Sequence, residues 1–223
     1  EARLWRVGEA PDSMAVLPRL TLAADGSDCV ITIAGQPFPL RLNAPGRHLA
    51  RNATTVLAAV AALGTDIPTA AAALAAFRPG AGRGQLAPIL NGQAALLDES
   101  YNASTLSIRS SLAVLDLLAT ARRVSVLGDI RELGAFARAE HESLLSAALA
   151  HADLVFCSGP NMQYLFDLLP SSRRGAWAPD AASLAPTVRA ALAPGDTVLV
   201  KGSLGSRMRD VISVLTADET ETR

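Results

Sequence analysis

The sequence predicts an α/β fold, a doubly wound and mainly parallel sheet that follows a smaller segment containing a hairpin and two helices. Two observations predict it. From residue 94 onward, short apolar runs alternate with segments of helical period, which is the pattern of repeated βα units. Glycines or polar side chains follow four of these apolar runs, as expected for loops at the carboxyl ends of parallel strands. Connections of this length predict right-handed crossovers.

The first part of the chain, residues 17–42, has the composition of β structure. Its apolar segments 29–33 and 38–42 are separated by a turn at 34–36, so they predict a hairpin. A helix is expected over 49–63, where Ala, Val, Leu and Thr predominate. A helix of that composition is buried on most of its surface.

A glycine-rich stretch marks the expected domain boundary. Gly64 stands where a helix commonly ends, and a second helix is expected over 68–77. The stretch 78–84 that follows contains three glycines and a proline, which disfavour regular structure. We therefore expect one domain over 1–82 and a second over 83–223.

Within the second domain, strands and helices are expected to alternate. An apolar run of strand length is followed each time by a longer amphipathic segment. The expected strands span 94–97, 124–127, 154–157, 176–178 and 197–200, and the expected helices span 107–119, 138–150, a short segment up to 168, 181–192 and 207–215.

Four expected strands end in residues that could hold a ligand. In a doubly wound sheet these ends lie along one edge, so carboxylates and the single lysine of the chain can share a crevice there. The alternative is that such residues only cap the following helices. The residues concerned are Asp98 and Glu99, Gly128 and Asp129, Ser158 and Gly159, and Lys201, Gly202 and Ser203.

The composition excludes several classes of function. The formal net charge is −1 and the basic residues form no block, which argues against a nucleic-acid or anionic-membrane surface. Cys29 and Cys157 lie far apart without a metal-binding spacing, which favours a reduced, cytoplasmic protein. Apolar runs are too short for a membrane span of about 18 residues. Lys201 is the only lysine among the 20 basic residues, so a compact ammonium group is expected to matter there.

Several self-sufficient catalytic motifs are absent from the sequence. It has no G-x-G-x-x-G after the first strand of the repeat, no G-x-x-x-x-G-K-[ST], no H-E-x-x-H and no G-x-S-x-G. We therefore expect neither a dinucleotide fingerprint nor a complete catalytic centre within this chain.

A set of short motifs nevertheless resembles one known family. They run in the order G-R-H with an asparagine four residues after the histidine, G-R, D-E-S-Y-N, L-G-D-x-x-E-L-G, a histidine, and V-K-G-S with a later methionine. This combination is similar to the Mur ligases that add D-alanyl-D-alanine to UDP-N-acetylmuramoyl-tripeptide. The residues are Gly46–His48, Asn52, Gly82–Arg83, Asp98–Asn102, Leu127–Gly134, His141, Val200–Ser203 and Met208.

The resemblance implies an ATP-dependent amide ligase of peptidoglycan synthesis that works through an acyl-phosphate. It implies that residues 1–82 are the end of a central ATP-binding domain and 83–223 a Rossmann-like carboxy-terminal domain. The amino-terminal domain and the phosphate-loop half of the central domain would then lie outside this sequence. The ligands for Mg²⁺ would lie there too, so no metal ligand is expected here, and the chain alone is expected to be inactive.

The resemblance also implies roles for ten residues of the chain. Asn52 and His48 would contact adenine, Glu99 the ribose, and Arg83 a phosphate of ATP. Arg83 and Lys201 are the expected catalytic residues. The expected substrate-binding residues, which would lie near the incoming dipeptide or the acyl-phosphate, are Asp98, Tyr101, Asn102, Asp129, Lys201 and Ser203.

Two other interpretations stay open at the level of sequence. One is another ligase of the same superfamily, such as the tripeptide-forming Mur ligase or a folylpolyglutamate synthase, against which Ser100–Asn102 argues. The other is a non-catalytic Rossmann-like module that binds a small ligand. For the ligase, the expected partners are small molecules only (the UDP-linked tripeptide, D-Ala-D-Ala and ATP), and a monomer is expected.

Overall fold

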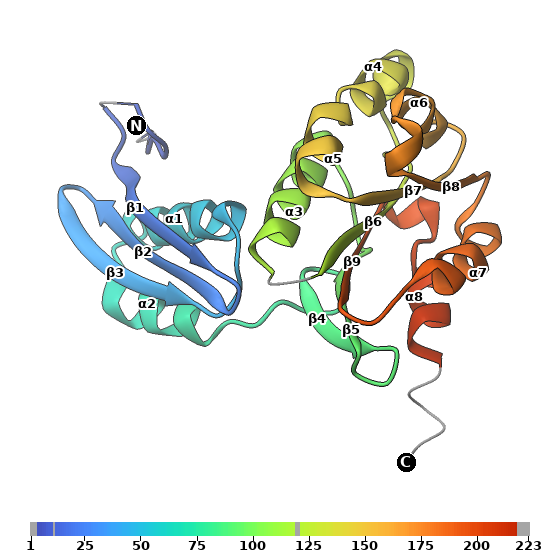
Figure 1. Ribbon diagram of the computed structural model, residues 1–223. Coiled ribbons are helices and arrows are strands. Elements are labelled where there is room, and N and C mark those ends of the chain that lie inside the picture. The colour runs from blue at the N-terminus through green and yellow to red at the C-terminus, as the bar shows by residue number, and fades with distance from the viewer. Residues whose placement is uncertain (1–3, 11, 119–120, 218–223) are drawn as a thin grey trace. The chain divides into compact units, whose positions relative to one another are not determined.

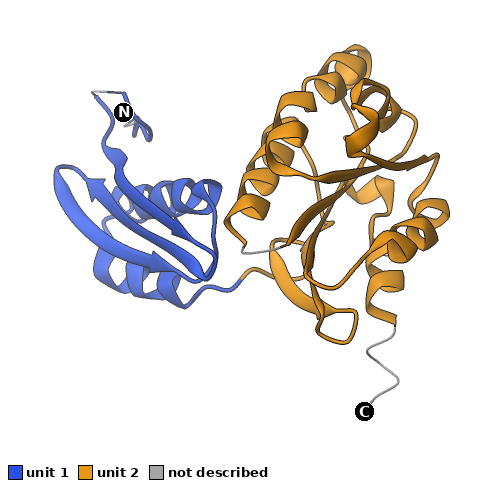
Figure 2. Ribbon diagram, viewed as in Figure 1, with its two compact units in different colours: residues 1–78 blue, residues 79–223 orange. Residues whose placement is uncertain are grey.

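The computed structural model describes residues 4–10, 12–118 and 121–217. The chain separates into two compact units, residues 1–78 and 79–223 (Figure 2). The division lies at the start of the glycine-rich stretch, a few residues before the boundary expected after residue 82.

The first unit is a three-stranded antiparallel sheet covered by two helices (Figure 1). On β2, Cys29, Ile31 and Ile33 alternate with more exposed residues, so one face of the sheet forms a core. Ala50 and Leu57 of the first helix pack against that face. The hairpin and both helices predicted from the sequence are present, and a further strand precedes the hairpin. The elements are β1 (Ala15–Ala23), β2 (Gly26–Ile33), β3 (Gln36–Leu42), α1 (Arg47–Ala62) and α2 (Ile67–Ala76).

The second unit contains a six-stranded sheet in the order β4-β5-β9-β6-β7-β8. All neighbouring pairs are parallel except β4 with β5. The predicted α/β fold with a mainly parallel, doubly wound sheet is confirmed. The strands are β4 (Gln85–Ile89), β5 (Ala94–Glu99), β6 (Arg122–Gly128), β7 (Leu154–Ser158), β8 (Arg174–Ala178) and β9 (Asp196–Lys201).

The antiparallel edge strand β4 was not expected from the sequence. It is short, contains Pro88, and exposes Gln85 and Leu86, so it lacks the continuous apolar run that marks the inner strands. Its pairing with β5 makes it a strand, and a proline is tolerated there because β4 lies at the edge of the sheet.

Helices cover both faces of this sheet, as Figure 1 shows. One core contains residues of α3, α5 and α6, and the other contains residues of α7 and α8. The expected helix over 138–150 is two helices in the structure, and the expected end at Ala119 lies outside the described residues. The helices are α3 (Thr105–Leu117), α4 (Ala137–Glu142), α5 (Leu145–His151), α6 (Met162–Leu168), α7 (Ala181–Ala191) and α8 (Arg209–Thr216).

The helices that follow neighbouring strands do not all pack on the same face of this sheet. The helices that follow β5 and β6 pack on one face of the sheet, whereas α8, which follows β9, packs on the other. Chain connections therefore diverge between β9 and both of its neighbours. In open α/β sheets ligands bind at such divergence points, outside the carboxyl ends of the strands.

None of the helices in the described part of the chain is both long enough and apolar enough to cross a membrane.

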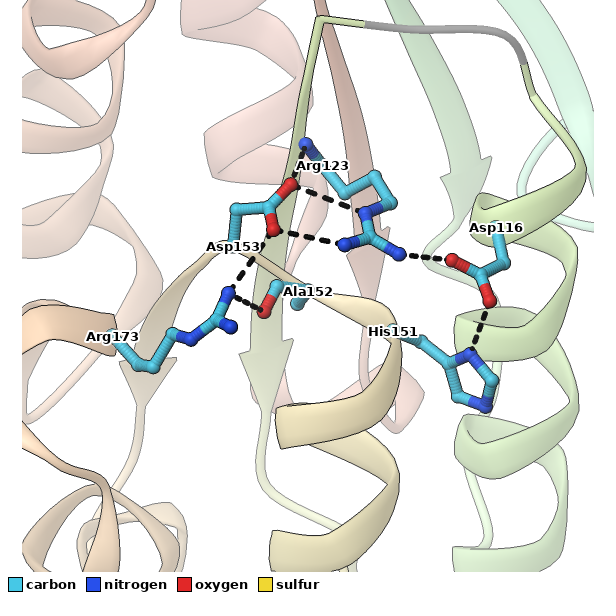
Figure 3. Close-up of polar contacts among 6 residues, drawn as sticks. All are labelled: Asp116, Arg123, His151, Ala152, Asp153 and Arg173. Atoms are coloured by element: carbon cyan, nitrogen blue, oxygen red, sulfur yellow. Dashed lines mark hydrogen bonds and ion pairs between the residues drawn. The ribbon is translucent and has the colours of Figure 1, made fainter.

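A network of charged side chains connects the amino ends of β6, β7 and β8 in the six-stranded sheet (Figure 3). Asp153, just before β7, accepts hydrogen bonds from the guanidinium of Arg123 on β6 at 2.9 and 3.1 Å. Arg173, just before β8, donates to the same carboxylate at 3.0 Å. Asp116 of α3 pairs with Arg123. The other oxygen of the Asp116 carboxylate lies 2.8 Å from Nδ1 of His151, at the end of α5. Three strand starts and two helices are thereby tied together.

The Arg123 guanidinium lowers the pKa of the Asp153 carboxyl below its ordinary value, and His151 does the same to the pKa of Asp116. A carboxyl group with a lowered folded-state pKa stabilises the fold above its unfolded pKa of about 3.9. That stabilisation is lost as the pH falls from there toward the folded-state value.

We predict that Asp153→Asn lowers the melting temperature by roughly 4 °C at pH 7, because it removes a charged acceptor shared by two arginines. The difference from the wild type should narrow between about pH 5 and pH 2, since only the wild type loses this stabilisation on protonation. Thermal unfolding across that range measures it. Asp210→Asn is the control, because Asp210 pairs with the exposed Arg207 in the same unit. An equal loss in both variants would contradict the prediction.

Candidate functional site

The carboxyl ends of β5, β9 and β6 bring the predicted site residues of the second unit to one edge of the sheet. Glu99 is paired with Lys201 in the β5–β9 ladder, and Lys201 with Leu127 in the β6–β9 ladder. Asp129 follows β6 by one residue. We call this edge the carboxyl rim.

Lys201 is the charged centre of the carboxyl rim. Its side chain is only 3% exposed, and its ammonium donates to Glu99 Oε2 and to the Asn102 carbonyl oxygen, both at 3.1 Å. A buried ammonium is tolerated only when it is paired and hydrogen-bonded, and both conditions hold here. Lys201 therefore ties the end of β9 to the loop that follows β5, and its amine faces that loop.

Asp98 holds the chain that enters the second unit. Its two carboxylate oxygens accept the N–H groups of Gly82 (3.1 Å) and Ser100 (3.0 Å). The main chain adds two bonds, from Gly84 N–H to the Asp98 carbonyl at 2.8 Å and from Tyr101 N–H to the Gly82 carbonyl at 3.0 Å. Asp98, predicted to bind substrate, thus uses both carboxylate oxygens on backbone groups.

Arg83 and Tyr101 form a stacked pair at the surface. The Arg83 guanidinium carbon lies 3.9 Å from the centre of the Tyr101 ring, within the range of a cation–π interaction. Both side chains are exposed, so the arginine is oriented but still accessible to a ligand. The neighbouring Asn102 is exposed too, and its side-chain oxygen accepts from Ala103 N–H.

Asp129 organises the loops that follow β6 and β7. Its carboxylate is 1% exposed and accepts from the backbone N–H groups of Asn161 and Met162 and from the Asn161 amide, at 2.8–3.1 Å. It therefore satisfies the start of α6. A Cβ on Gly159 would lie 2.4 Å from this carboxylate, so only glycine fits there.

Ser203 and His141 hold the loop that follows Asp129. The Ser203 hydroxyl oxygen accepts from Arg131 N–H at 3.0 Å, and Ser203 N–H donates to the Asp129 carbonyl. The fully buried His141 accepts from Ile130 N–H through Nε2 at 3.1 Å, so its proton is on Nδ1, which donates to the Ala137 carbonyl. No structural role for His141 was expected from the sequence, although its motif drew attention to it.

His48 and Asn52, the expected adenine contacts, belong to the first unit. They lie one turn apart in α1, so they share a face of that helix, with His48 half-buried and Asn52 exposed. The other eight predicted site residues belong to the second unit, and all of them come from the carboxyl rim or the segment that leads into it.

A hollow of about 270 Å³ lies beside Asp129, where the loops after β6, β7 and β8 meet the start of α8. Arg131, Ser158, Asp180 and Arg207 are among the residues that line it. Charges of both signs line the hollow, so it does not favour an anion over a cation. Nowhere in the described part of the chain do three or more His, Cys, Asp or Glu side chains form a cluster that could hold a metal ion.

Residues 82–204 match the family model described as Mur ligase, glutamate ligase domain. The chain belongs to the Mur ligase family. The match covers the whole carboxyl rim, from Arg83 to Lys201, within one stretch of sequence.

Curated relatives of this Mur ligase chain carry the name UDP-N-acetylmuramoyl-tripeptide–D-alanyl-D-alanine ligase. The enzyme of Rickettsia prowazekii is 29% identical over 74% of this chain and 37% of its own length. That of Escherichia coli is 29% identical over 98% of this chain and 48% of its own length. The chain thus spans half or less of these relatives. A UDP-N-acetylmuramate–L-alanine ligase of Mycolicibacterium vanbaalenii is 27% identical over 90% of this chain and 45% of its own length.

Solved Mur ligase structures have the same fold as this Mur ligase chain. A structure of MurF from Acinetobacter baumannii superposes with a TM-score of 0.80 at 22% identity, over 92% of this chain and 45% of that one. MurF from Thermotoga maritima, solved in complex with ADP, gives a TM-score of 0.77 at 19% identity, over 96% and 48%. At these identities the likeness establishes the fold.

We predict that Lys201→Met destabilises this Mur ligase chain by about 3–5 kcal/mol. The Glu99 side chain is only 12% exposed, and the substitution would leave its carboxylate without the positive charge that it pairs with. Glu99→Gln should also destabilise it. The double variant should be less destabilised than the sum of the two single variants, since it removes both charges. Urea unfolding of the four proteins measures this coupling, and additive losses would show that the two side chains are not an energetic pair.

Proposed function

We propose that this chain acts as the carboxy-terminal half of an ATP-dependent ligase that joins D-Ala-D-Ala to UDP-N-acetylmuramoyl-tripeptide. The observation that carries the proposal is the carboxyl rim, where an exposed Arg83 lies over the Tyr101 ring and Lys201 is buried in a pair with Glu99. The printed names of the relatives at 29% identity supply the reaction.

In the proposed reaction, ATP phosphorylates the tripeptide carboxylate and the amine of D-Ala-D-Ala then attacks the acyl-phosphate. Phosphoryl transfer depends mainly on positioned positive charge. Arg83 suits this purpose because a guanidinium binds phosphate through two parallel hydrogen bonds and stays charged at all relevant pH values. ATP as the nucleotide accords with the ADP complex of one similar structure.

Lys201 and Asp98 would support the site indirectly. Lys201 places the Glu99 carboxylate through Oε2, so a ribose hydroxyl would bind Glu99 through Oε1. Asp129 and Ser203 would hold the loops that face the dipeptide, since their polar atoms already bind backbone groups.

Tyr101 and Asn102, which are exposed, are the proposed contacts for the dipeptide itself. His48 and Asn52 are proposed to bind adenine.

A second candidate is the same bond-forming chemistry with a different amine. It is favoured by the relative named as an L-alanine-adding ligase, at 27% identity over 90% of the chain. The two candidates share the acyl-phosphate chemistry and differ in both the carboxylate substrate and the amine acceptor, so a comparison of the two substrate pairs separates them.

The other proposed properties follow from this reaction. The substrates are small molecules, the protein acts as a monomer in the cytoplasm, and Mg²⁺ is a cofactor whose ligands lie outside this chain.

The first test uses the full-length ligase with the UDP-linked tripeptide and ATP. We expect release of phosphate with D-Ala-D-Ala as acceptor and none above background with L-alanine and the UDP-linked sugar. The 223-residue chain alone should give no ligation. Turnover with L-alanine only would favour the second candidate, and ligation by this chain alone would contradict the proposed division of labour.

The second test concerns Arg83. In the full-length ligase, Arg83→Ala should lower kcat by roughly tenfold or more, with a smaller change in the KM for ATP, as expected for a contact made mainly in the transition state. Arg138→Ala is the matched control, because Arg138 also lies over an exposed tyrosine, 5.3 Å from the ring of Tyr164. A normal kcat for Arg83→Ala would remove this residue from the reaction.

A further inference from the structure

The segment Gly82–Gly84 is bound to the carboxyl rim more firmly than its composition suggests. Two main-chain hydrogen bonds, and one that Gly82 N–H donates to the Asp98 carboxylate, join it to residues 98–101. These bonds continue the β4–β5 pairing beyond Gln85, which is paired with Asp98. A glycine-rich segment would otherwise be expected to sample many conformations.

The two glycines are required by geometry. Gly82 and Gly84 have φ values of +75° and +101°, a region that other residues rarely adopt. A Cβ on Gly82 would also lie 3.1 Å from both the Cβ and the backbone nitrogen of Tyr101. The close approach of these two residues places the Arg83 side chain over the Tyr101 ring.

Asp98 stabilises this arrangement in a way that asparagine could not. Each of its carboxylate oxygens accepts one backbone N–H, from Gly82 and from Ser100. An asparagine has a single acceptor oxygen, and its amide would place donor against donor at the other position. The Tyr101 ring then restricts the Arg83 side chain, whose conformational freedom is otherwise large.

We propose that Asp98 and Tyr101 are positioning residues for Arg83: Asp98 fixes the backbone of Gly82, and the Tyr101 ring aligns the guanidinium. The kinetic part of this inference rests on the proposed function, in which Arg83 binds a phosphate of ATP. The structural part concerns this chain alone.

Limited trypsin digestion of this chain tests the structural part. The Arg83–Gly84 bond should be cleaved slowly in the wild type, and about tenfold faster in Asp98→Asn, because a protease requires the anchored segment to open. Tyr101→Leu should accelerate the same cleavage severalfold, whereas Tyr101→Phe, which keeps an aromatic face, should not. Cleavage is compared with that at other arginines of the same sample.

Two matched controls separate this effect from general loss of stability. Asp180→Asn removes another carboxylate that accepts a backbone N–H, at the start of α7. Tyr164→Leu removes the ring beneath Arg138. Neither should accelerate cleavage at Arg83–Gly84. Equal rates in the wild type and Asp98→Asn, or equal acceleration in the controls, would overturn the proposal. If Asp98→Asn is cleaved faster at every arginine, the Tyr101→Leu and Tyr101→Phe pair decides.

Steady-state kinetics of the full-length ligase test the kinetic part. Asp98→Asn should lower kcat in the same way as Arg83→Ala, and the double variant should lose little more than Arg83→Ala alone. Losses that multiply would show that Asp98 acts independently of Arg83. If the full-length ligase does not ligate D-Ala-D-Ala at all, the proposed function fails, and the trypsin experiment still decides whether Asp98 and Tyr101 position Arg83.

Discussion

The buried pair of Lys201 and Glu99 is the interaction on which the carboxyl rim depends. Removing two charges from water is costly, and here a second acceptor, the Asn102 carbonyl, adds to the compensation. The pair joins β9 to β5, one of the two neighbours of β9 from which its chain connection diverges. Because Lys201 holds both Glu99 and the Asn102 carbonyl, the backbone of the loop after β5 is fixed where it leaves the strand.

Most polar residues of the carboxyl rim bind other parts of the chain. Asp129 accepts three hydrogen bonds at the start of α6, His141 bridges two backbone groups, and Asp98 holds Gly82 and Ser100. These contacts hold the loops at the carboxyl ends of the strands, while the side chains of Arg83 and Tyr101 stay exposed. Under the proposed function, the buried hydrogen bonds would keep the loops rigid and the exposed side chains would contact the ligand, an arrangement that suits catalysis by positioned charge.

The two ends of the parallel sheet serve different purposes. At the amino ends of the strands, Arg123, Asp153 and Arg173 form an ion-pair network that ties together β6, β7 and β8. At the carboxyl ends, Gly128, Gly159 and Gly202 allow the side chains of Met208, Asp129 and Ser206 to pack closely against the backbone. Ion pairs thus hold the amino ends of the strands, whereas hydrogen bonds to backbone groups hold the loops at the carboxyl ends, which is the end where folds of this class bind their ligands.

The sequence by itself determined the fold class and the inner strands, because apolar runs such as 124–127 and 197–200 are buried on both faces and have no other stable environment. It also placed Asp98, Asp129 and Lys201 at one edge, since parallel strands end together. Only the tertiary structure decided what these side chains bind. Strand β4 exists through its pairing with β5, and Lys201 meets Glu99 across about a hundred residues. Such long-range pairings depend on register and burial, which no local pattern of residues specifies.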